Sequence, residues 1–212
     1  MSGQLIVLRH GESKWNARGV WTGTRNVDLT DKGTHEAELM GEQCRGMHVD
    51  VAFISQQVRT LETLHGVLKG MGHHLHVPYH ISGAINERDY GIYTGKNKWH
   101  IEQEIGEGRF EAIRRGWDTP IPEGETLKQV YARSVPFYQQ TVVPLLLEGK
   151  NVMIIAHGNS IRSLMKYIES ISDAKVVNLE MIFGTILIYH VDEAGRMTHK
   201  EIKTIATELP PA

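Results

Sequence analysis

The 212-residue chain is expected to form an α/β fold, a three-layer sandwich with a mostly parallel central sheet. Short apolar runs such as Leu5–Leu8 and Val152–Ala156 alternate with longer amphipathic stretches, which is the pattern of buried strands joined by helices. Both of these runs lead into a His-Gly pair, at His10 and at His157. Ligands of open α/β sheets bind beyond the carboxyl ends of the strands, so the two pairs mark a candidate site.

The first half of the chain is expected to supply two strands, two helices and a long loop. Thr30 is placed to cap a helix, because its hydroxyl can accept a free amide proton of the first turn. Gly70 and Gly72 favour the end of another. Residues 78–98 are rich in Gly, Tyr and charge without periodicity, which indicates a functional loop. The expected elements are strands at Leu5–Leu8 and Val51–Ser55, and helices from Thr30 to about Arg45 and at Val58–Met71.

The second half is expected to be mainly helical. The segment Thr119–Gly124 is a clear break, and Pro136 and Pro144 predict a kink or an early end in the helix that follows it. No linker or low-complexity segment divides the chain, so a single domain over residues 1–212 is expected, with a flexible tail from about residue 200. The expected elements are one or two short helices within 97–115, a long helix at Thr126–Leu147, a strand at Val152–Ala156, helices at Ser160–Ser170 and Asp173–Leu179, a strand at Thr185–Val191 and an edge strand at Lys200–Ile205.

Composition and charge exclude several functional classes. The formal net charge is −2, whereas nucleic-acid-binding proteins are usually basic. Cys44 is the one cysteine, so no intrachain disulfide can form, which fits a reducing compartment. The apolar run before Arg9 is too short for a signal peptide, and no run approaches the roughly 18 residues of a membrane helix. A cytoplasmic protein is therefore expected.

His10 is the candidate nucleophile. Histidine titrates near neutral pH, so a neutral ring nitrogen able to attack is available at pH 7. Arg9 beside it offers a fork of donors for phosphate, Gly11 allows close approach of a ligand, and Ser13 and Asn16 add further donors. Taken alone, His10 is read equally well as a strand-end histidine bonded to a neighbouring carbonyl. The second His-Gly pair tips the balance toward catalysis.

His157 and Arg59 extend this candidate site. If the two strands that precede the histidines are neighbours, both imidazoles face one phosphorus. One ring would attack, and the other would stabilise charge on the phosphoryl oxygens. Arg59 lies in the first turn of the helix after the second strand, where the helix N-terminus also favours an anion. A buried core histidine and a solvated surface arginine are the alternative readings of these two residues.

Further charged residues complete the pattern. Lys98 and the Arg114-Arg115 doublet would make a cationic pocket in a nearly neutral protein. Glu87 is the acid–base candidate, because moving a phosphoryl group between hydroxyls requires a group that takes and returns a proton. The alternative for Glu87 is an ion pair with an arginine in a surface loop.

These residues resemble the motifs of cofactor-dependent phosphoglycerate mutases in the histidine phosphatase superfamily. Arg9–Asn16 is similar to the family motif RHGESxWN, and the similarity runs in family order from about Leu5 to Val191. The short Arg-His-Gly motif alone indicates only the superfamily, whereas the extended set favours the mutase. The further matching segments are Trp21–Thr30, Asn86–Gly91, Gly95–Lys98, Arg114-Arg115 and Ala156–Ser160.

The resemblance implies a phosphoglycerate mutase-like fold and the interconversion of 2-phosphoglycerate and 3-phosphoglycerate in glycolysis and gluconeogenesis. It implies that His10 carries the phosphoryl group, that Glu87 exchanges the proton and that His157 stabilises the group in transfer. It also implies 2,3-bisphosphoglycerate as primer, no metal, and a tail from Lys200 to Ala212 that folds over the site. The implied phosphoryl ligands are Arg9, Ser13, Asn16, Arg59 and Asn159, and those for the rest of the substrate are Thr22, Gly23, Arg88, Tyr90, Lys98, Arg114, Arg115 and Gly158.

Three departures from the family pattern stand out. Asp89 stands where the family usually has histidine or a similar residue, and it adds negative charge near an anion site. Ile182 stands where proline is common, and is expected only to shape the start of a strand. The segment between Arg115 and Thr126 is shorter than in many members, which leaves both a homodimer and a monomer open.

Three other functions fit part of this pattern. A phosphohydrolase would use the same phosphohistidine with water as acceptor, but Lys98 and Arg114-Arg115 favour retention of a phosphoglycerate. A non-catalytic binder of phosphorylated ligands would explain the cations, but not the paired His-Gly strands. A metal protein is the third, since histidines are dense in one region, although their spacing fits no standard zinc site. These histidines are His65, His73, His74, His76 and His80.

Overall fold

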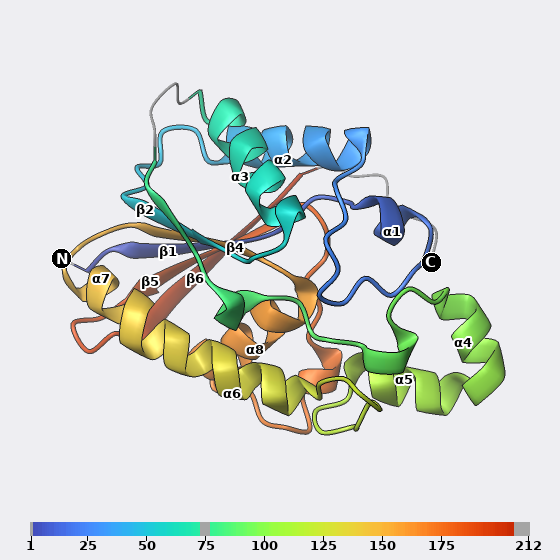
Figure 1. The fold of residues 1–212 in the computed structure, drawn as a ribbon. Coiled ribbons are helices and arrows are strands. Elements are labelled where there is room, and N and C mark those ends of the chain that lie inside the picture. The colour runs from blue at the N-terminus through green and yellow to red at the C-terminus, as the bar shows by residue number, and fades with distance from the viewer. Residues whose placement is uncertain (1, 73–76, 206–212) are drawn as a thin grey trace.

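The computed structural model describes residues 2–72 and 77–205, and a six-stranded sheet runs through this part of the chain (Figure 1). The strand order is β3-β2-β4-β1-β5-β6. Neighbours from β3 to β1 pair in parallel, whereas β5 pairs antiparallel with both β1 and β6. Among the described strands β5 alone runs against the others, which confirms a mostly parallel sheet. The strands are β1 (Gln4–Arg9), β2 (Val51–Ile54), β3 (Tyr79–Ile81), β4 (Val152–Ala156), β5 (Thr185–Val191) and β6 (Met197–Thr204).

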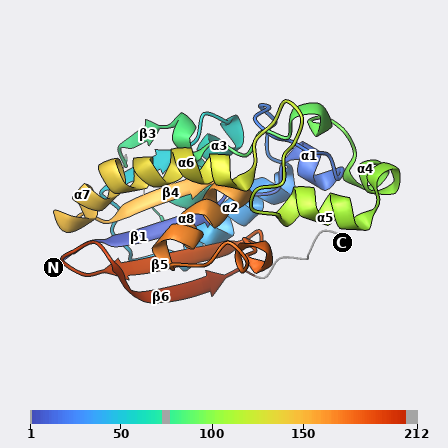
Figure 2. The ribbon, with the colours of Figure 1, turned by 90° about the horizontal axis from the view of Figure 1, so that it is seen from below.

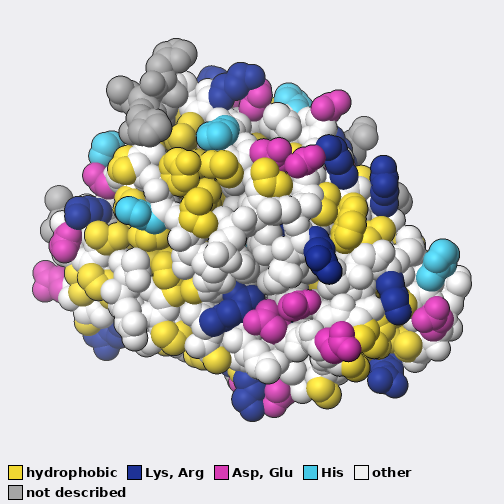
Figure 3. Space-filling view, in the orientation of Figure 1, with side chains coloured by type: hydrophobic (Ala, Val, Ile, Leu, Met, Phe, Trp, Pro, Cys, Tyr) yellow, Lys and Arg dark blue, Asp and Glu magenta, His cyan; other side chains and the backbone are white. Residues whose placement is uncertain are grey.

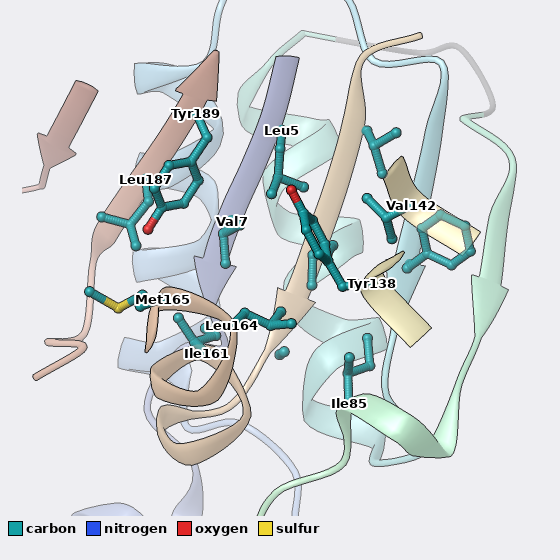
Figure 4. Packing of buried hydrophobic residues seen from close by; sticks show 14 of the residues in the cluster. Leu5, Val7, Ile85, Tyr138, Val142, Ile161, Leu164, Met165, Leu187 and Tyr189 are labelled. Carbon is teal, nitrogen blue, oxygen red and sulfur yellow. The ribbon is translucent and has the colours of Figure 1, made fainter. Parts of the chain in front are cut away.

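Alternate residues of the central strands pack against opposite helix layers, because successive side chains of a strand point to opposite faces. Leu5 and Val7 of β1 share a core with Tyr138 and the helix α8 (Figure 4). Ile6 and Leu8 pack instead with α2 and α3. Figure 2 shows α6, α7 and α8 together over one face of the sheet, so the expected three layers are present. The helices of the two layers are α2 (Asp31–Gln43), α3 (Val58–Gly70), α6 (Leu127–Phe137), α7 (Val143–Leu147) and α8 (Gly158–Ile168).

A smaller aromatic cluster lies beyond the carboxyl ends of the parallel strands, where Figures 1 and 2 show α4 and α5. Trp21, Tyr90 and Phe110 are buried together there. The region 78–98, expected as a loop, contains β3 and two single 3-10 turns. The remaining short elements are α1 (Lys14–Ala17), η1 (Gly83–Ile85), η2 (Gly91–Tyr93), α4 (Lys98–Ile105) and α5 (Glu107–Arg115).

The expected long helix at Thr126–Leu147 is divided into three. Thr126 caps α6, whose regular turns end at Phe137, and a π-helix at Tyr138–Val142 leads into α7. Pro144 has no N–H to donate to the carbonyl four residues earlier, so the hydrogen-bond register must change before it. The predicted interruption is confirmed, and it takes the form of a π-helical segment.

The expected helix at Asp173–Leu179 is wrong. The structure has only one 3-10 turn there, η4 (Val176–Asn178). Val176 is the one residue of this turn that is buried, and its carbonyl accepts a hydrogen bond from Arg162 at 2.9 Å. A segment this short has too little packing to offset the cost of starting a helix.

The C-terminal region is strand as far as Thr204, so the expected flexible tail does not begin at residue 200. Residues 206–212, and with them the predicted closure over the site, lie outside the described residues. Within the described ranges no helix combines the length and apolar character needed to span a bilayer. On the face in Figure 3, basic and acidic side chains are interspersed, in keeping with the near-neutral net charge.

The helices α2 and α3 are in close contact through glycines. A Cβ atom at Gly41 would overlap the carbonyl oxygen of Val67, and one at Gly66 would lie 2.6 Å from the Cβ of Ala37. The helix α3 that is packed in this way carries Arg59 in its first turn.

Gly41→Ala is therefore expected to destabilise the protein by about 1–3 kcal/mol, because a buried methyl group must be accommodated in a full interface. Gly108→Ala is the matched control, since Gly108 lies in α5 and a Cβ there has nothing within 4 Å. Urea unfolding at pH 7.5 measures both, and the control should be neutral or slightly more stable than wild type. Equal effects of the two substitutions would contradict the packing account.

Candidate active site

The site is built on the pairing of β1 with β4. Arg9 lies opposite Ala156 in this parallel pair, so the next residues, His10 and His157, emerge side by side. Their ring centroids are 4.9 Å apart, and the two side chains are 2% and 0% exposed. The structure thus brings together the two histidines that the sequence could only place at the ends of two strands.

The His10 ring is oriented by a hydrogen bond to the backbone of the next residue, Gly11. Nδ1 lies 2.6 Å from the carbonyl oxygen of Gly11, which can only accept, so Nδ1 carries the proton. Nε2 then keeps its lone pair, and Arg59 Nε donates to it at 3.3 Å. Burial, with Arg59 and Arg9 nearby, holds the pKa of His10 well below its usual value. His10 is therefore neutral at pH 7, with Nε2 as its nucleophilic atom.

The His157 ring is held in the opposite tautomer. Its Nε2 lies 2.7 Å from Ser55 Oγ, and Ser55 in turn donates to Gln57 Oε1 at 3.0 Å. Since the one proton of Ser55 is directed at Gln57, the serine oxygen accepts from His157 Nε2. The pKa of His157 is also well below its usual value, chiefly through burial and then Arg59. Its Nδ1 is buried without a hydrogen-bond partner in the described chain, which leaves this atom for a ligand.

Two arginines, Arg9 and Arg59, lie beside the histidine pair. The Arg9 guanidinium stacks on the ring of Phe183 at 3.7 Å and donates through Nη1 to the carbonyl of Met181 at 2.6 Å. Arg59 donates to the carbonyls of Arg25 and Gly23 at 2.8 and 3.1 Å. Burial lowers the pKa of Arg59 to about 10, and it lowers the pKa of Arg9 as well. An arginine with a pKa of about 10 is still charged at pH 7, so a cation is fixed beside the neutral nucleophile.

Glu87 is held through one of its two oxygens. Oε1 accepts from the backbone N–H of Arg88 at 2.7 Å and from the side chain of Asn159 at 3.1 Å. Arg162 orients Asn159 by donating to its Oδ1 at 3.0 Å. These bonds all fall on Oε1, so Oε2 is the oxygen placed to exchange a proton. Arg162 was not anticipated, although its spacing of three residues from Asn159 on a helix is a usable signal.

A pocket of about 130 Å³ opens beside Glu87 and Arg9. Lys98 lies over the ring of Trp21 at 5.6 Å, and burial lowers its pKa to about 8, so it is mostly protonated at pH 7. The wall also includes Arg162, Leu179, Glu180 and Met181. The predicted site residues on this wall are Arg9, Glu87, Tyr90, Lys98, Arg114, Arg115, Gly158 and Asn159.

Eight predicted site residues are not on the wall of this pocket. Three of them are His10, His157 and Arg59, described above, and the other five have different surroundings. Ser13 and Asn16 bond to each other and cap α1. Thr22 is buried, and the carbonyl of Gly23 is bonded to Arg59. Arg88 is fully buried and donates to carbonyls at the end of α5. Contact of these five with a substrate stays a prediction.

The loop that carries Glu87 is fixed by an arginine that the sequence did not single out. Arg133 of α6 donates to the carbonyls of Asn86 and Glu87 at 3.0 and 3.2 Å and forms an ion pair with Glu125 at 2.8 Å. Glu125 also accepts from the N–H of Asp89, whose own carboxylate accepts from Gly91 at 2.8 Å. Asp89, the departure from the family pattern, therefore serves the turn of this loop.

The histidine-rich region was the candidate for a metal site, and the structure describes only part of it. Among the residues that the structure describes, no group of three or more His, Cys, Asp or Glu could hold a metal ion. His65 and His80 are exposed, and His73, His74 and His76 lie outside the described residues.

Known proteins resemble this chain in sequence and in fold. The model of the histidine phosphatase superfamily (branch 1) matches residues 5–201. A protein named 2,3-bisphosphoglycerate-dependent phosphoglycerate mutase 2 from Lactiplantibacillus plantarum is 36% identical over 93% of this chain and 97% of its own length. One named 2,3-bisphosphoglycerate-dependent phosphoglycerate mutase from Tropheryma whipplei is 38% identical, with 92% and 96% covered.

Two solved structures show the likeness of the fold. Bacillus stearothermophilus YhfR superposes with a TM-score of 0.81 at 25% identity over 93% of this chain and 95% of its own. An Escherichia coli protein described as a putative alpha-ribazole-5'-P phosphatase gives 0.79 at 19% identity over 100% of both chains, which shows the fold alone. The resemblance drawn from the sequence motifs is confirmed by these matches.

The two buried histidines predict how stability depends on pH. Their folded pKa values lie well below 6.5, so between those values and 6.5 the unfolded chain binds more protons than the folded one. The contribution of the two histidines to the free energy of unfolding should be fully present above about pH 6.5. Below that pH, the free energy of unfolding should fall by up to about 1.4 kcal/mol per pH unit for each histidine.

Urea unfolding at pH 7.5 and pH 5.5 tests this. A His10→Gln, His157→Gln double variant should lose most of the dependence in this range, whereas His35→Gln, at an exposed histidine, should keep it. An equally steep decline in the double variant would contradict the assignment.

Proposed function

Because the chain belongs to the histidine phosphatase superfamily, we propose that it is a 2,3-bisphosphoglycerate-dependent phosphoglycerate mutase that interconverts 3-phosphoglycerate and 2-phosphoglycerate through a phosphohistidine at His10. The observation that carries the proposal is the pairing of neutral His10 with His157, whose ring centroids are 4.9 Å apart. Arg9 lies beside this pair and, with Glu87, lines a mainly cationic pocket. The names of the relatives support the choice of reaction.

In the first step, His10 Nε2 attacks a phosphorus of the priming bisphosphoglycerate. The new N–P bond forms as the bond from phosphorus to the glycerate oxygen breaks, and protonated Glu87 gives its proton to that oxygen. Arg9 and Arg59 balance the charge on the phosphoryl oxygens, and His157 does so once the bound anion has favoured uptake of a proton on its Nδ1. The bond of His10 Nδ1–H to Gly11 remains in place and supports the ring as Nε2 becomes substituted.

In the second step, a hydroxyl of a bound monophosphoglycerate attacks the phosphohistidine. The O–P bond forms, the N–P bond breaks, and the Glu87 carboxylate takes the hydroxyl proton. Net isomerisation requires that the bisphosphate intermediate stay bound and present its other phosphate to His10. Lys98, Arg114 and Arg115 are the cations on the pocket wall that would hold it through this reorientation.

Hydrolysis of the phosphohistidine by water is the second candidate function, and one observation favours it. Arg115 is already bonded to Glu180 at 2.9 Å and to Glu111 at 3.2 Å, and Arg114 is bonded to Glu111 at 3.3 Å. A doublet that is partly neutralised holds a multiply charged intermediate less firmly than free cations would.

The proposal includes several finer points. The primer is 2,3-bisphosphoglycerate, no metal takes part, and the enzyme works in the cytoplasm in glycolysis and gluconeogenesis. A single domain over residues 1–212 and the roles given to individual residues belong to the proposal. So does the choice between homodimer and monomer, which the described chain leaves open.

Conversion of 3-phosphoglycerate to 2-phosphoglycerate, assayed with and without 2,3-bisphosphoglycerate, tests the proposal. Wild type should require the primer after full dephosphorylation and should form an acid-labile phosphohistidine. His10→Ala should be inactive, and Glu87→Gln should lower kcat by about 10²–10⁴-fold, because it cannot exchange the proton. An active His10→Ala would refute the mechanism, and inorganic phosphate as the main product would favour the hydrolase.

A further inference from the structure

Glu180 is a carboxylate on the wall of an otherwise mainly cationic pocket. It lies between η4 and β5, and its Oε1 accepts from Arg115 Nη2 at 2.9 Å. The pocket wall has one other acidic residue, Glu87, whose oxygen Oε1 is bonded to Arg88 and Asn159. In the described chain, Arg115 is the one hydrogen-bond and ion-pair partner of the Glu180 carboxylate.

The segment of Glu180 contacts two of the cations on the pocket wall. Its neighbour Met181 accepts from Arg9 at 2.6 Å through its carbonyl, and Phe183 stacks on the same guanidinium at 3.7 Å. One short stretch of chain, residues 180–183, therefore contacts both Arg9, which lies beside the nucleophile, and Arg115. Charge at Glu180 acts on an anion bound anywhere between these two arginines.

We propose that Glu180 is an internal competitor of the bound substrate: it occupies Arg115 in the empty site, must give up that bond when the distal anionic group of a phosphoglycerate binds, and so sets how often the bisphosphate intermediate escapes. This inference rests on the proposed mutase function. It makes Glu180 a residue that determines the balance between retention and release.

The charges and the exposure of the pair support competition. Hydrogen bonding to Arg115 lowers the pKa of Glu180, so the carboxylate is ionised at neutral pH. Its side chain is 54% exposed, so the bond can be exchanged for one to a ligand without burying an unpaired charge. A bisphosphoglycerate carries more negative charge than a monophosphoglycerate, so the repulsion weakens binding of the intermediate more than that of substrate or product.

The experiment uses full-length protein phosphorylated with labelled 2,3-bisphosphoglycerate and then mixed with unlabelled 3-phosphoglycerate. The label is divided between free bisphosphate, which has escaped, and later products. Glu180→Gln and Glu180→Ala should release about two- to fivefold less labelled bisphosphate per turnover, and should need correspondingly less primer for half-maximal activity.

Asp118→Asn is the matched control. The Asp118–Lys128 ion pair has the same length, 2.9 Å, and the same carboxylate exposure, 54%, as the Glu180–Arg115 pair, and Asp118 is not on the pocket wall. The Asp118→Asn substitution removes the same charge from the protein as Glu180→Gln does. Its division of label between free bisphosphate and later products should nevertheless equal that of wild type.

Three results would overturn the inference. The first is an unchanged release of labelled bisphosphate per turnover in both Glu180 variants, and the second is an increased release. The third is a change in Asp118→Asn equal to that in the Glu180 variants. Labelled His10 with normal mutase turnover in these cases would leave the proposed function standing. Failure of wild type to label His10 would instead refute the proposed function, and the inference with it.

Discussion

The 2.6 Å hydrogen bond from His10 Nδ1 to the Gly11 carbonyl decides which ring nitrogen can react. It depends on glycine at position 11, because a Cβ there would overlap the carbonyl oxygen of Gly33. It also depends on the parallel pairing of β1 with β4, which brings His157 beside the ring. Backbone contacts thus fix the orientation of His10 and the distance between the two histidine rings. Little side-chain freedom therefore remains to be lost when a substrate binds.

The electrostatics of the empty site follow from this arrangement. Burial and arginine keep both imidazoles neutral, and burial leaves arginine donors unsatisfied within the described chain, at Arg9 Nε and Arg162 Nε among others. An anion would satisfy such donors and favour proton uptake by His157, so binding and protonation should reinforce each other. A protein with a net charge of −2 thus concentrates positive charge where it is used. Glu180 limits that concentration at one side of the pocket.

Local patterns were enough to predict the frame of the molecule. The runs at Val152–Ala156 and Thr185–Val191 match β4 and β5, because buried strands are short, apolar and bounded by breaks. The two His-Gly pairs were found for the same reason. The helix expected at Asp173–Leu179 was wrong because its composition says nothing about how little of it is buried. Pro144 predicted the interruption of the long helix, but it did not predict the π-helical form.

Contacts between distant parts of the chain could not be predicted. Ser55 reaches His157 across 102 positions, and Glu180 reaches Arg115 across 65. No local period marks such residues, since each is chosen by its partner in space and not by its neighbours in sequence. Arg133 is a similar case, because its role depends on carbonyl groups 46 to 50 positions away.

The position of the phosphoryl group on the His10 ring tests the account most directly. Nitrogen-15 NMR of the phosphorylated protein, with His10 assigned by comparison with His10→Ala, distinguishes the two ring nitrogens. The structure predicts phosphorus on Nε2 with a proton retained on Nδ1, in its bond to Gly11. Phosphorus on Nδ1, or a phosphorylated residue other than His10, would contradict it.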